Sequence, residues 1–159
     1  MPISVTQADN NDYLGFVEVF KEAEEFHRVN APWKFTKPEP ELFSKNYFEE
    51  LISAPDYKFS LAKEDGKIVG FIIAFIRKTS PIPLFKKRDW IEVDNLVVKN
   101  EYRKQGIGNL LIHEIENRAR TCDIADIELN VWDFNKGAIA FYEKGGYEIY
   151  SHRMRKTIK

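Results

Sequence analysis

Residues 95–120 read "NLVVKNEYRKQGIGNLLIHEIENRAR". The segment passes from an apolar stretch, through two basic residues and two glycines, into a sequence whose apolar residues recur at helical spacing. Backbone N–H groups at a helix N-terminus are unpaired, and the helix dipole favours negative charge there. Glycines allow a bulky anion to approach the main chain, and Arg103 and Lys104 add positive charge. We therefore predict a diphosphate-binding loop in front of this helix.

Two familiar phosphate-binding loops do not fit this segment. A Walker A loop continues with Lys and then Ser or Thr after its last glycine, whereas Asn109 and Leu110 follow Gly108 here. A dinucleotide-binding loop has a third glycine where this chain has Leu111, and Glu128 is only a weak candidate for its acidic residue. Both interpretations are disfavoured.

The hydrophobic pattern predicts alternating strands and helices along the chain. Asp65-Gly66 between two β-rich runs predicts a tight hairpin. Strand, helix and strand across 89–131 imply a right-handed crossover, and therefore a parallel pair in an otherwise antiparallel sheet. The predicted strands are 3–7, 57–63, 67–78, 89–98, 124–131 and 147–155, and the predicted helices start at 12, about 40, about 107 and about 136.

Composition and charge narrow the class of protein. The 159 residues fit one domain, and the near-neutral net charge of −1 argues against a nucleic-acid-binding protein. Cys122 is the single cysteine, and three scattered histidines offer no metal-ligand spacing, so no metal site is expected. The sequence has no apolar run of membrane-spanning length and no signal peptide, which favours the cytoplasm.

Two motifs resemble the GNAT superfamily of acetyl-CoA-dependent N-acetyltransferases. The segment Arg103–Gly108 matches that family's R/Q-x-x-G-x-G/A signature. Downstream, "LNVWDFNKGAIAFYEKGGYE" is similar to its N-x-x-A-x-x-x-Y-x-K-x-G-F segment, with Tyr147 where phenylalanine is commoner and Gly145 where leucine is usual. The two motifs in this order, within about residues 89–150, make the resemblance specific.

The resemblance implies a fold and a cofactor site. The fold would be a single three-layer α/β domain over residues 1–159, with about four helices. Its twisted, mixed and mostly antiparallel sheet would have six or seven strands and a splayed central parallel pair. Acetyl-CoA would bind as co-substrate, with its pantetheine arm between the parted strands. The implied cofactor-binding residues are Leu96, Val97, Val98, Arg103, Lys104, Gln105, Gly106, Ile107, Gly108, Asn109, Asn135 and Tyr142.

The resemblance also implies three catalytic candidates. An alkylammonium acceptor is mostly protonated at pH 7, so a base helps transfer. Glu92 and Asp94 alternate on the strand 89–98 and are expected on one face, with Glu92 preferred as base and Asp94 as second choice. Tyr142 is the candidate acid for the departing thiolate, and it lies two helical turns after Asn135. Asn135 also reads as an ordinary helix N-cap.

The acceptor is expected on the N-terminal side of the chain. Aromatic residues of the segment 27–48 could line its cleft, and Glu18, Glu22 and Glu25 could attract a cation. The alternative, which the pattern favours, is that these glutamates form an ordinary solvated helix face. A small-molecule amine and a protein amine both remain open as partners, and so does a homodimer, which is common in such families. The alternative function is a non-catalytic acyl-CoA-binding sensor or partner-binding module on the same fold.

Overall fold

The computed structural model describes residues 2–38 and 41–158. By its internal contacts the chain separates into two compact units, one ending at Leu129 and the other starting at Asn130. The first unit holds a sheet with three helices, and the second holds one helix followed by the C-terminal segment.

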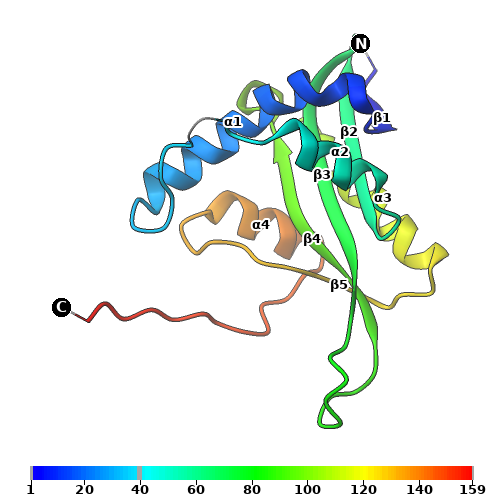
Figure 1. Ribbon diagram of the computed structural model, residues 1–159, viewed down its shortest axis with the longest axis vertical. Coiled ribbons are helices and arrows are strands. Elements are labelled where there is room, and N and C mark those ends of the chain that lie inside the picture. Colours follow the sequence, from blue (N-terminus) through cyan, green and yellow to red (C-terminus); the bar gives the residue numbers. More distant parts are fainter. Residues whose placement is uncertain (1, 39–40, 159) are drawn as a thin grey trace. The chain divides into compact units, whose positions relative to one another are not determined.

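The sheet of the first unit has five strands in sequential order (Figure 1). All neighbouring strands run antiparallel except the last two, which are parallel. The mixed, mostly antiparallel sheet with one parallel pair is therefore confirmed. The strands are β1 (Ser4–Gln7), β2 (Tyr57–Glu64), β3 (Lys67–Lys78), β4 (Asp89–Val98) and β5 (Asp126–Leu129).

Local sequence signals explain where the first helices begin. The helix α1 (Tyr13–Asn30) follows a short 3-10 turn, Asn10–Asp12, whose N-cap Asp9 forms a capping box with Asp12. The helix α2 (Lys45–Ser53) begins where the Ser44 hydroxyl accepts a hydrogen bond from the Tyr47 amide at 3.2 Å. The predicted start near residue 40 was too early, and residues 39 and 40 themselves lie outside the described part of the chain.

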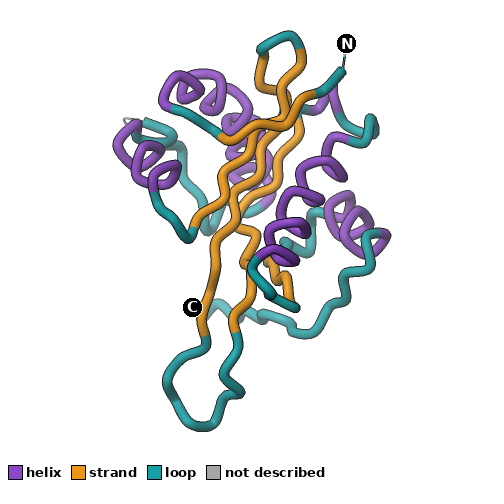
Figure 2. The backbone as a smooth tube through the Cα atoms, turned by 90° about the vertical axis from the view of Figure 1, so that its right-hand side faces the viewer, coloured by secondary structure: helices purple, strands orange, loops and turns teal. Residues whose placement is uncertain are grey.

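Two turns shape the antiparallel strands. Asp65 and Gly66 have φ of +48° and +76°, as the tight turn between β2 and β3 requires, so the predicted hairpin is confirmed. Between β3 and β4 the hairpin extends far beyond the helices (Figure 2). Thr79 and Arg88 join the two sides of this hairpin where its loop begins. The Thr79 hydroxyl accepts from the Arg88 amide at 2.8 Å, and the Thr79 amide donates to the Arg88 carbonyl at 3.0 Å.

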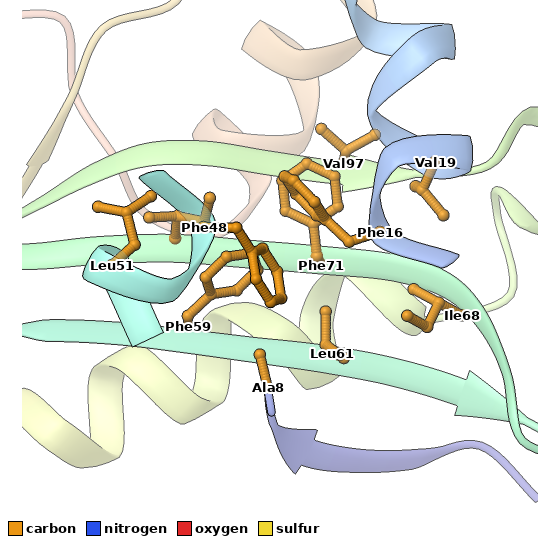
Figure 3. Packing of buried hydrophobic residues seen from close by; sticks show 11 residues of the cluster. Ala8, Phe16, Val19, Phe48, Leu51, Phe59, Leu61, Ile68, Phe71 and Val97 are labelled. Atoms are coloured by element: carbon orange, nitrogen blue, oxygen red, sulfur yellow. The ribbon is translucent and has the colours of Figure 1, made fainter. Parts of the chain in front are cut away.

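One face of the sheet packs against α1 and α2. The register places Phe59 opposite Ile73, and Phe71 opposite Val97, so these side chains share a face. They join Phe16 of α1 in a dense aromatic cluster, in which the Phe16 and Phe71 ring centroids are 4.8 Å apart (Figure 3). Each such fully buried ring contributes roughly 1.5–3 kcal/mol to stability, which fixes both helices on this face.

The opposite face of the sheet is covered by α3 (Ile107–Thr121). Its buried stripe includes Ile107, Leu111 and Ile115. A Cβ atom at Gly70 of β3 would lie 2.8 Å from the Val97 carbonyl oxygen of β4 and 3.4 Å from the Leu111 side chain of α3, so a side chain at this position would collide with the neighbouring strand. The crossover from β4 through α3 to β5 therefore holds the predicted diphosphate loop at the carboxyl end of β4.

The second unit holds α4 (Lys136–Lys144), whose bounds agree with the predicted helix 136–144. The chain reverses after it at Gly146, which has φ +87°. Residues 147–158 form no strand, so the predicted strand 147–155 is wrong, and the described residues contain five strands rather than six or seven. A strand exists only through ladder bonds to a neighbour, and the second unit contains no other strand for this segment to pair with.

Candidate functional site

The predicted diphosphate loop has a left-handed backbone. Lys104 has φ +62° and Gly106, the N-cap of α3, has φ +82°. No atom would lie within 4 Å of a Cβ at Gly106, so the loop is open on that side. The amides of Ile107, Gly108 and Asn109 form the first helical turn, and no main-chain carbonyl of the described residues accepts from them. Amides that lack main-chain partners at the positive end of a helix dipole are the groups that favour a bound anion.

Side chains around the loop tie it to the rest of the unit. Arg103 Nε donates to the Val98 carbonyl at 3.0 Å, which fastens the loop to the last residue of β4. The Glu22 carboxylate on α1 accepts from the Asn100 amide at 2.9 Å, in the 3-10 turn Asn100–Tyr102 that precedes the loop. Lys104 is exposed and adds positive charge. The expected basic loop therefore lies directly at the strand end.

Strand β4 carries a β-bulge at Asp94. Ile73 of β3 pairs with Asn95, whereas the next residue, Ala74, pairs with Val93, so Asp94 is the extra residue. The parallel pairing with β5 ends at Val93. From Asp94 to Val98 the other edge of β4 pairs with no strand of the first unit. The pairing of β4 with β5 therefore ends before the carboxyl end of β4, as the sequence predicts. The bulge, however, is at Asp94 and not within Leu96–Val98.

The bulge changes which residues share a face. Glu92 pairs with Phe75, which lies on the α1 and α2 face, and beyond the bulge that face continues with Asn95 and Val97. The simple alternation that was expected to align Glu92 with Asp94 therefore does not hold. The Asp94 carboxyl nevertheless lies near that face, because its charge acts on Tyr47 of α2.

Glu92 is held by a stack of side chains. Trp90 Nε1 donates to a Glu92 carboxylate oxygen at 3.0 Å. The Arg88 guanidinium lies 4.5 Å from the Trp90 ring centroid and forms ion pairs with Asp126 and Glu128 of β5. The position of Glu92 is therefore determined by residues of both parallel strands.

Asp94 has a perturbed acidity. Burial raises the pKa of its carboxyl, the Asn95 side chain lowers it by donating a hydrogen bond at 2.8 Å, and the Glu92 charge raises it again. The Arg77 charge lowers the pKa of Asp94 by a smaller amount. The net effect is a pKa of the Asp94 carboxyl above its ordinary value, although the residue as a whole is exposed.

Asn135 and Tyr142 belong to the second unit. The Asn135 side chain accepts from the Ala138 amide at 3.2 Å, so its N-cap role is confirmed. The Tyr142 ring contacts Tyr147 edge-on, with centroids 5.4 Å apart. Burial raises the pKa of the Tyr142 phenol, and Tyr147 raises it further, so this hydroxyl stays protonated at neutral pH.

The acceptor side differs from the expectation. Phe48 is fully buried in the core and does not line a cleft, whereas Tyr47 is 48% exposed. Glu18 pairs with Lys21 of the same helix at 2.6 Å, and the Glu22 carboxylate accepts from the Asn100 amide, so two of the three glutamates already have partners within the first unit. The α1 and α2 face also carries residues that the sequence analysis missed. These are Tyr57, Phe75 and Arg77.

Two absences bear on the site. The parts of the chain that the structure describes contain no group of three or more His, Cys, Asp or Glu side chains that could hold a metal ion. Within residues 2–38 and 41–158, no helix is both long and apolar enough to cross a bilayer.

Comparison with known proteins decides the family. Residues 16–147 match the acetyltransferase (GNAT) family. The chain belongs to this family. An uncharacterized N-acetyltransferase of Methanocaldococcus jannaschii is 27% identical over 91% of this chain, which spans 59% of that protein's length. Another, of Archaeoglobus fulgidus, is 29% identical over 88% of this chain and 89% of its own length.

Solved structures agree with the GNAT fold. The crystal structure of a mutant of the BH1408 protein from Bacillus halodurans superposes with a TM-score of 0.93 and 22% identity, covering 98% of this chain and 99% of that one. The α/β sheet with a parallel pair and four helices is thus the fold of this GNAT chain.

Proposed function

We propose that this GNAT chain transfers an acetyl group from acetyl-CoA to a primary amine, by direct attack of the amine while both substrates are bound. The observation that carries the proposal is the left-handed Gly106 opening α3. The first-turn amides that follow it donate to no main-chain carbonyl of the described residues, and the neighbouring end of β4 pairs with no further strand of the first unit. A diphosphate and an extended thioester arm are the two ligand parts that such a loop and such a strand edge can bind together.

The residues present fit coenzyme A. The loop Arg103–Asn109 would hold the diphosphate through main-chain amides, with charge from Arg103 and Lys104. The edge of β4 at Leu96–Val98, which pairs with no further strand of the first unit, would pair with the pantetheine amides as an added strand does. The family match spans the junction between the two units, which supports one working domain over 1–159 that also uses Asn135 and Tyr142.

Asp94 becomes the preferred base, with Glu92 as its supporting charge. Asp94 is the bulge residue and lies where β4 and β5 part, next to the strand edge that would hold the thioester. Its raised pKa brings it closer to the working pH, as a proton acceptor requires. Glu92 lies within the paired region and is already bound by Trp90, which suits it to an electrostatic role.

The transfer step balances with these groups. The amine nitrogen attacks the thioester carbonyl carbon, a C–N bond forms, and the C–S bond breaks. Asp94 takes the proton that the amine loses, and Tyr142 gives a proton to the departing thiolate. Most of the acceleration would come from holding the two substrates together, for which about 7–11 kcal/mol is available.

Incubation with acetyl-CoA and a panel of amines, followed by release of free thiol, tests this function. We expect amine-dependent thiol release and an acetylated amine by mass spectrometry. Firm CoA binding with only slow, amine-independent hydrolysis across the panel would instead support the non-catalytic sensor.

The Tyr142→Phe variant tests the acid. We expect it to keep its affinity for CoA and to lose turnover, because the phenol acts only on the leaving thiolate. Tyr150→Phe, which alters an exposed tyrosine of the same unit, is the matched control. Unchanged turnover in Tyr142→Phe removes that residue from the mechanism.

A further inference from the structure

The bulge in β4 brings two neighbouring side chains together. In a regular strand, consecutive side chains point to opposite faces of the sheet. Asp94 is the extra residue of the bulge, so this alternation is broken between Asp94 and Asn95. Asn95 Nδ2 donates a hydrogen bond to Asp94 Oδ2 at 2.8 Å. The bulge therefore permits a contact that the regular alternation of a strand disfavours.

This hydrogen bond engages one oxygen of the Asp94 carboxylate and leaves the other. A carboxylate has two acceptor oxygens, and the torsion about its Cβ–Cγ bond is soft, so a carboxylate without partners takes many orientations. With Oδ2 held by Asn95, the direction of Oδ1 is defined. Within residues 2–38 and 41–158, Asp94 Oδ1 forms no hydrogen bond or ion pair. Oδ1 is therefore available to a group of the acceptor.

Other charged or titratable groups lie around this pair of side chains. Those that act on Asp94, or on the Tyr47 phenol that Asp94 influences, are Glu92 of β4, Arg77 of β3, Glu50 of α2 and Tyr57 of β2. Two contacts lower the pKa of Asp94, and the hydrogen bond from Asn95 has a larger effect than the charge of Arg77. Asn95 is thus the contact that most favours the ionised carboxylate, which is the form that can take a proton.

We propose that Asn95 is a positioning residue, whose side-chain amide holds Asp94 Oδ2 so that Oδ1 takes the proton of the attacking amine. The carboxylate then accepts two hydrogen bonds at once, one from Asn95 and one from the amine, and the amine proton moves to Oδ1. Asn95 acts only through Asp94. This inference rests on the proposed function, because it deepens the role of Asp94 as base.

The Asn95→Leu variant removes the donor and keeps a side chain of similar shape. We expect kcat to fall about three- to tenfold, as for the loss of one solvent-accessible hydrogen bond, while the Kd for CoA stays the same. The acidic limb of the kcat profile should move to higher pH, because the lost donor favoured the ionised form of Asp94. Steady-state kinetics across the pH range and calorimetry with CoA give these values.

Asn117→Leu is the matched control. Asn117 lies on α3, and its side chain also pairs with a charged neighbour, since Arg120 donates to its Oδ1 at 2.9 Å. This variant should leave kcat and its pH profile unchanged.

A double variant separates positioning from a general structural role. In the Asp94→Asn background, Asn95→Leu should cause no further loss of rate, because a residue that acts through the carboxylate has nothing left to position. A general structural role would lower the rate by the same factor in both backgrounds.

A titration without turnover tests the same contact. In a carbon-13 NMR titration of the Asp94 carboxyl, the midpoint should be higher in Asn95→Leu than in the unaltered protein or in Asn117→Leu. This measurement needs neither acetyl-CoA nor an amine, so a failure of acetyl transfer and a failure of this inference remain distinguishable. Two results would overturn the inference. One is a midpoint that Asn95→Leu leaves unchanged, and the other is an equal loss of rate with and without the Asp94 carboxylate.

Discussion

The proposed diphosphate loop and the proposed acceptor face, which is the face of the sheet that packs against α1 and α2, are built in different ways. The loop 103–109 relies on main-chain amides, and its sequence requirements are two glycines and a following helix. The acceptor face relies on side chains from β3, β4 and α2, which come together only through strand register and the bulge at Asp94. A main-chain site tolerates many side chains around it, whereas a side-chain site changes its substrate with each substitution. This difference predicts that substitutions change the choice of acceptor more readily than the binding of CoA.

The Asp94→Asn variant should have the largest effect, and it tests whether catalysis and CoA binding depend on separate parts of the molecule. Loss of the base should lower kcat roughly 10²–10⁴-fold while CoA affinity stays the same, since the loop is untouched. Steady-state kinetics and calorimetry give the two values. Asp89→Asn alters an exposed aspartate of the same strand and should leave both unchanged. A normal rate in Asp94→Asn would return the role of base to Glu92.

The complementary change breaks the loop. Gly106→Val places a β-branched residue at φ +82°, a conformation that costs about 1–2 kcal/mol for a residue with a Cβ. We expect the Kd for CoA to rise at least about tenfold, because relief of the strain moves the first-turn amides.

Gly66→Val is its matched control, since Gly66 is also left-handed at φ +76° and equally open around its Cβ. It should lower Tm by a similar amount and leave CoA binding intact. Equal losses of CoA affinity in both variants would show that the loop has no special role.

The pH dependence of kcat tests the charges around Asp94. A protonated carboxyl cannot accept the proton of the amine, so kcat should fall as the pH drops through the raised pKa of Asp94. The charged or titratable groups that act on or with this carboxyl are Glu92, Arg77 and Tyr47. Glu92→Gln removes a charge that raises the pKa, so the acidic limb should move to lower pH, and Arg77→Gln should move it to higher pH. Shifts in the same direction would contradict this arrangement.

The smallest expected effect comes from Trp90→Phe. The ring that stacks under Arg88 is kept, but the N–H that holds Glu92 is lost. Because the Glu92 charge remains, we expect kcat to fall less than about tenfold, with CoA affinity and acceptor KM nearly unchanged. A larger loss than in Glu92→Gln would mean that Trp90 contacts the substrate itself.

Much of the fold follows from the sequence because its signals are local. The strands 67–78 and 89–98 and the helix 136–144 agree with the structure residue for residue. Each of the signals spans only a few positions. They are the alternation of apolar residues in the strands, Asp65-Gly66 at the hairpin turn and Gly145-Gly146 at the end of the last helix. The early start predicted for α2 overlooked Ser44, whose N-cap signal was present in the sequence.

The missed features depend on contacts between distant residues. The bulge at Asp94 has no local signature, and it overturned the face assignment of Glu92 and Asp94. Arg77 became a candidate only when the register placed it across from Trp90, beside Phe75. The strand predicted for 147–155 was wrong for a related reason. Its residues favour extended structure, but a strand also needs a neighbouring strand with which to form hydrogen bonds, and a local sequence does not reveal one.

The hydrogen bond from the Asn100 amide to Glu22 joins α1 to the turn in front of the diphosphate loop. When the turn opens, the Glu22 carboxylate loses the Asn100 amide as its hydrogen-bond donor. Local opening of the turn and local opening of α1 around Glu22 are therefore expected to be coupled. In a deuterium-exchange experiment, these two segments, far apart in the chain, should exchange at a common rate and slow down together when CoA is added.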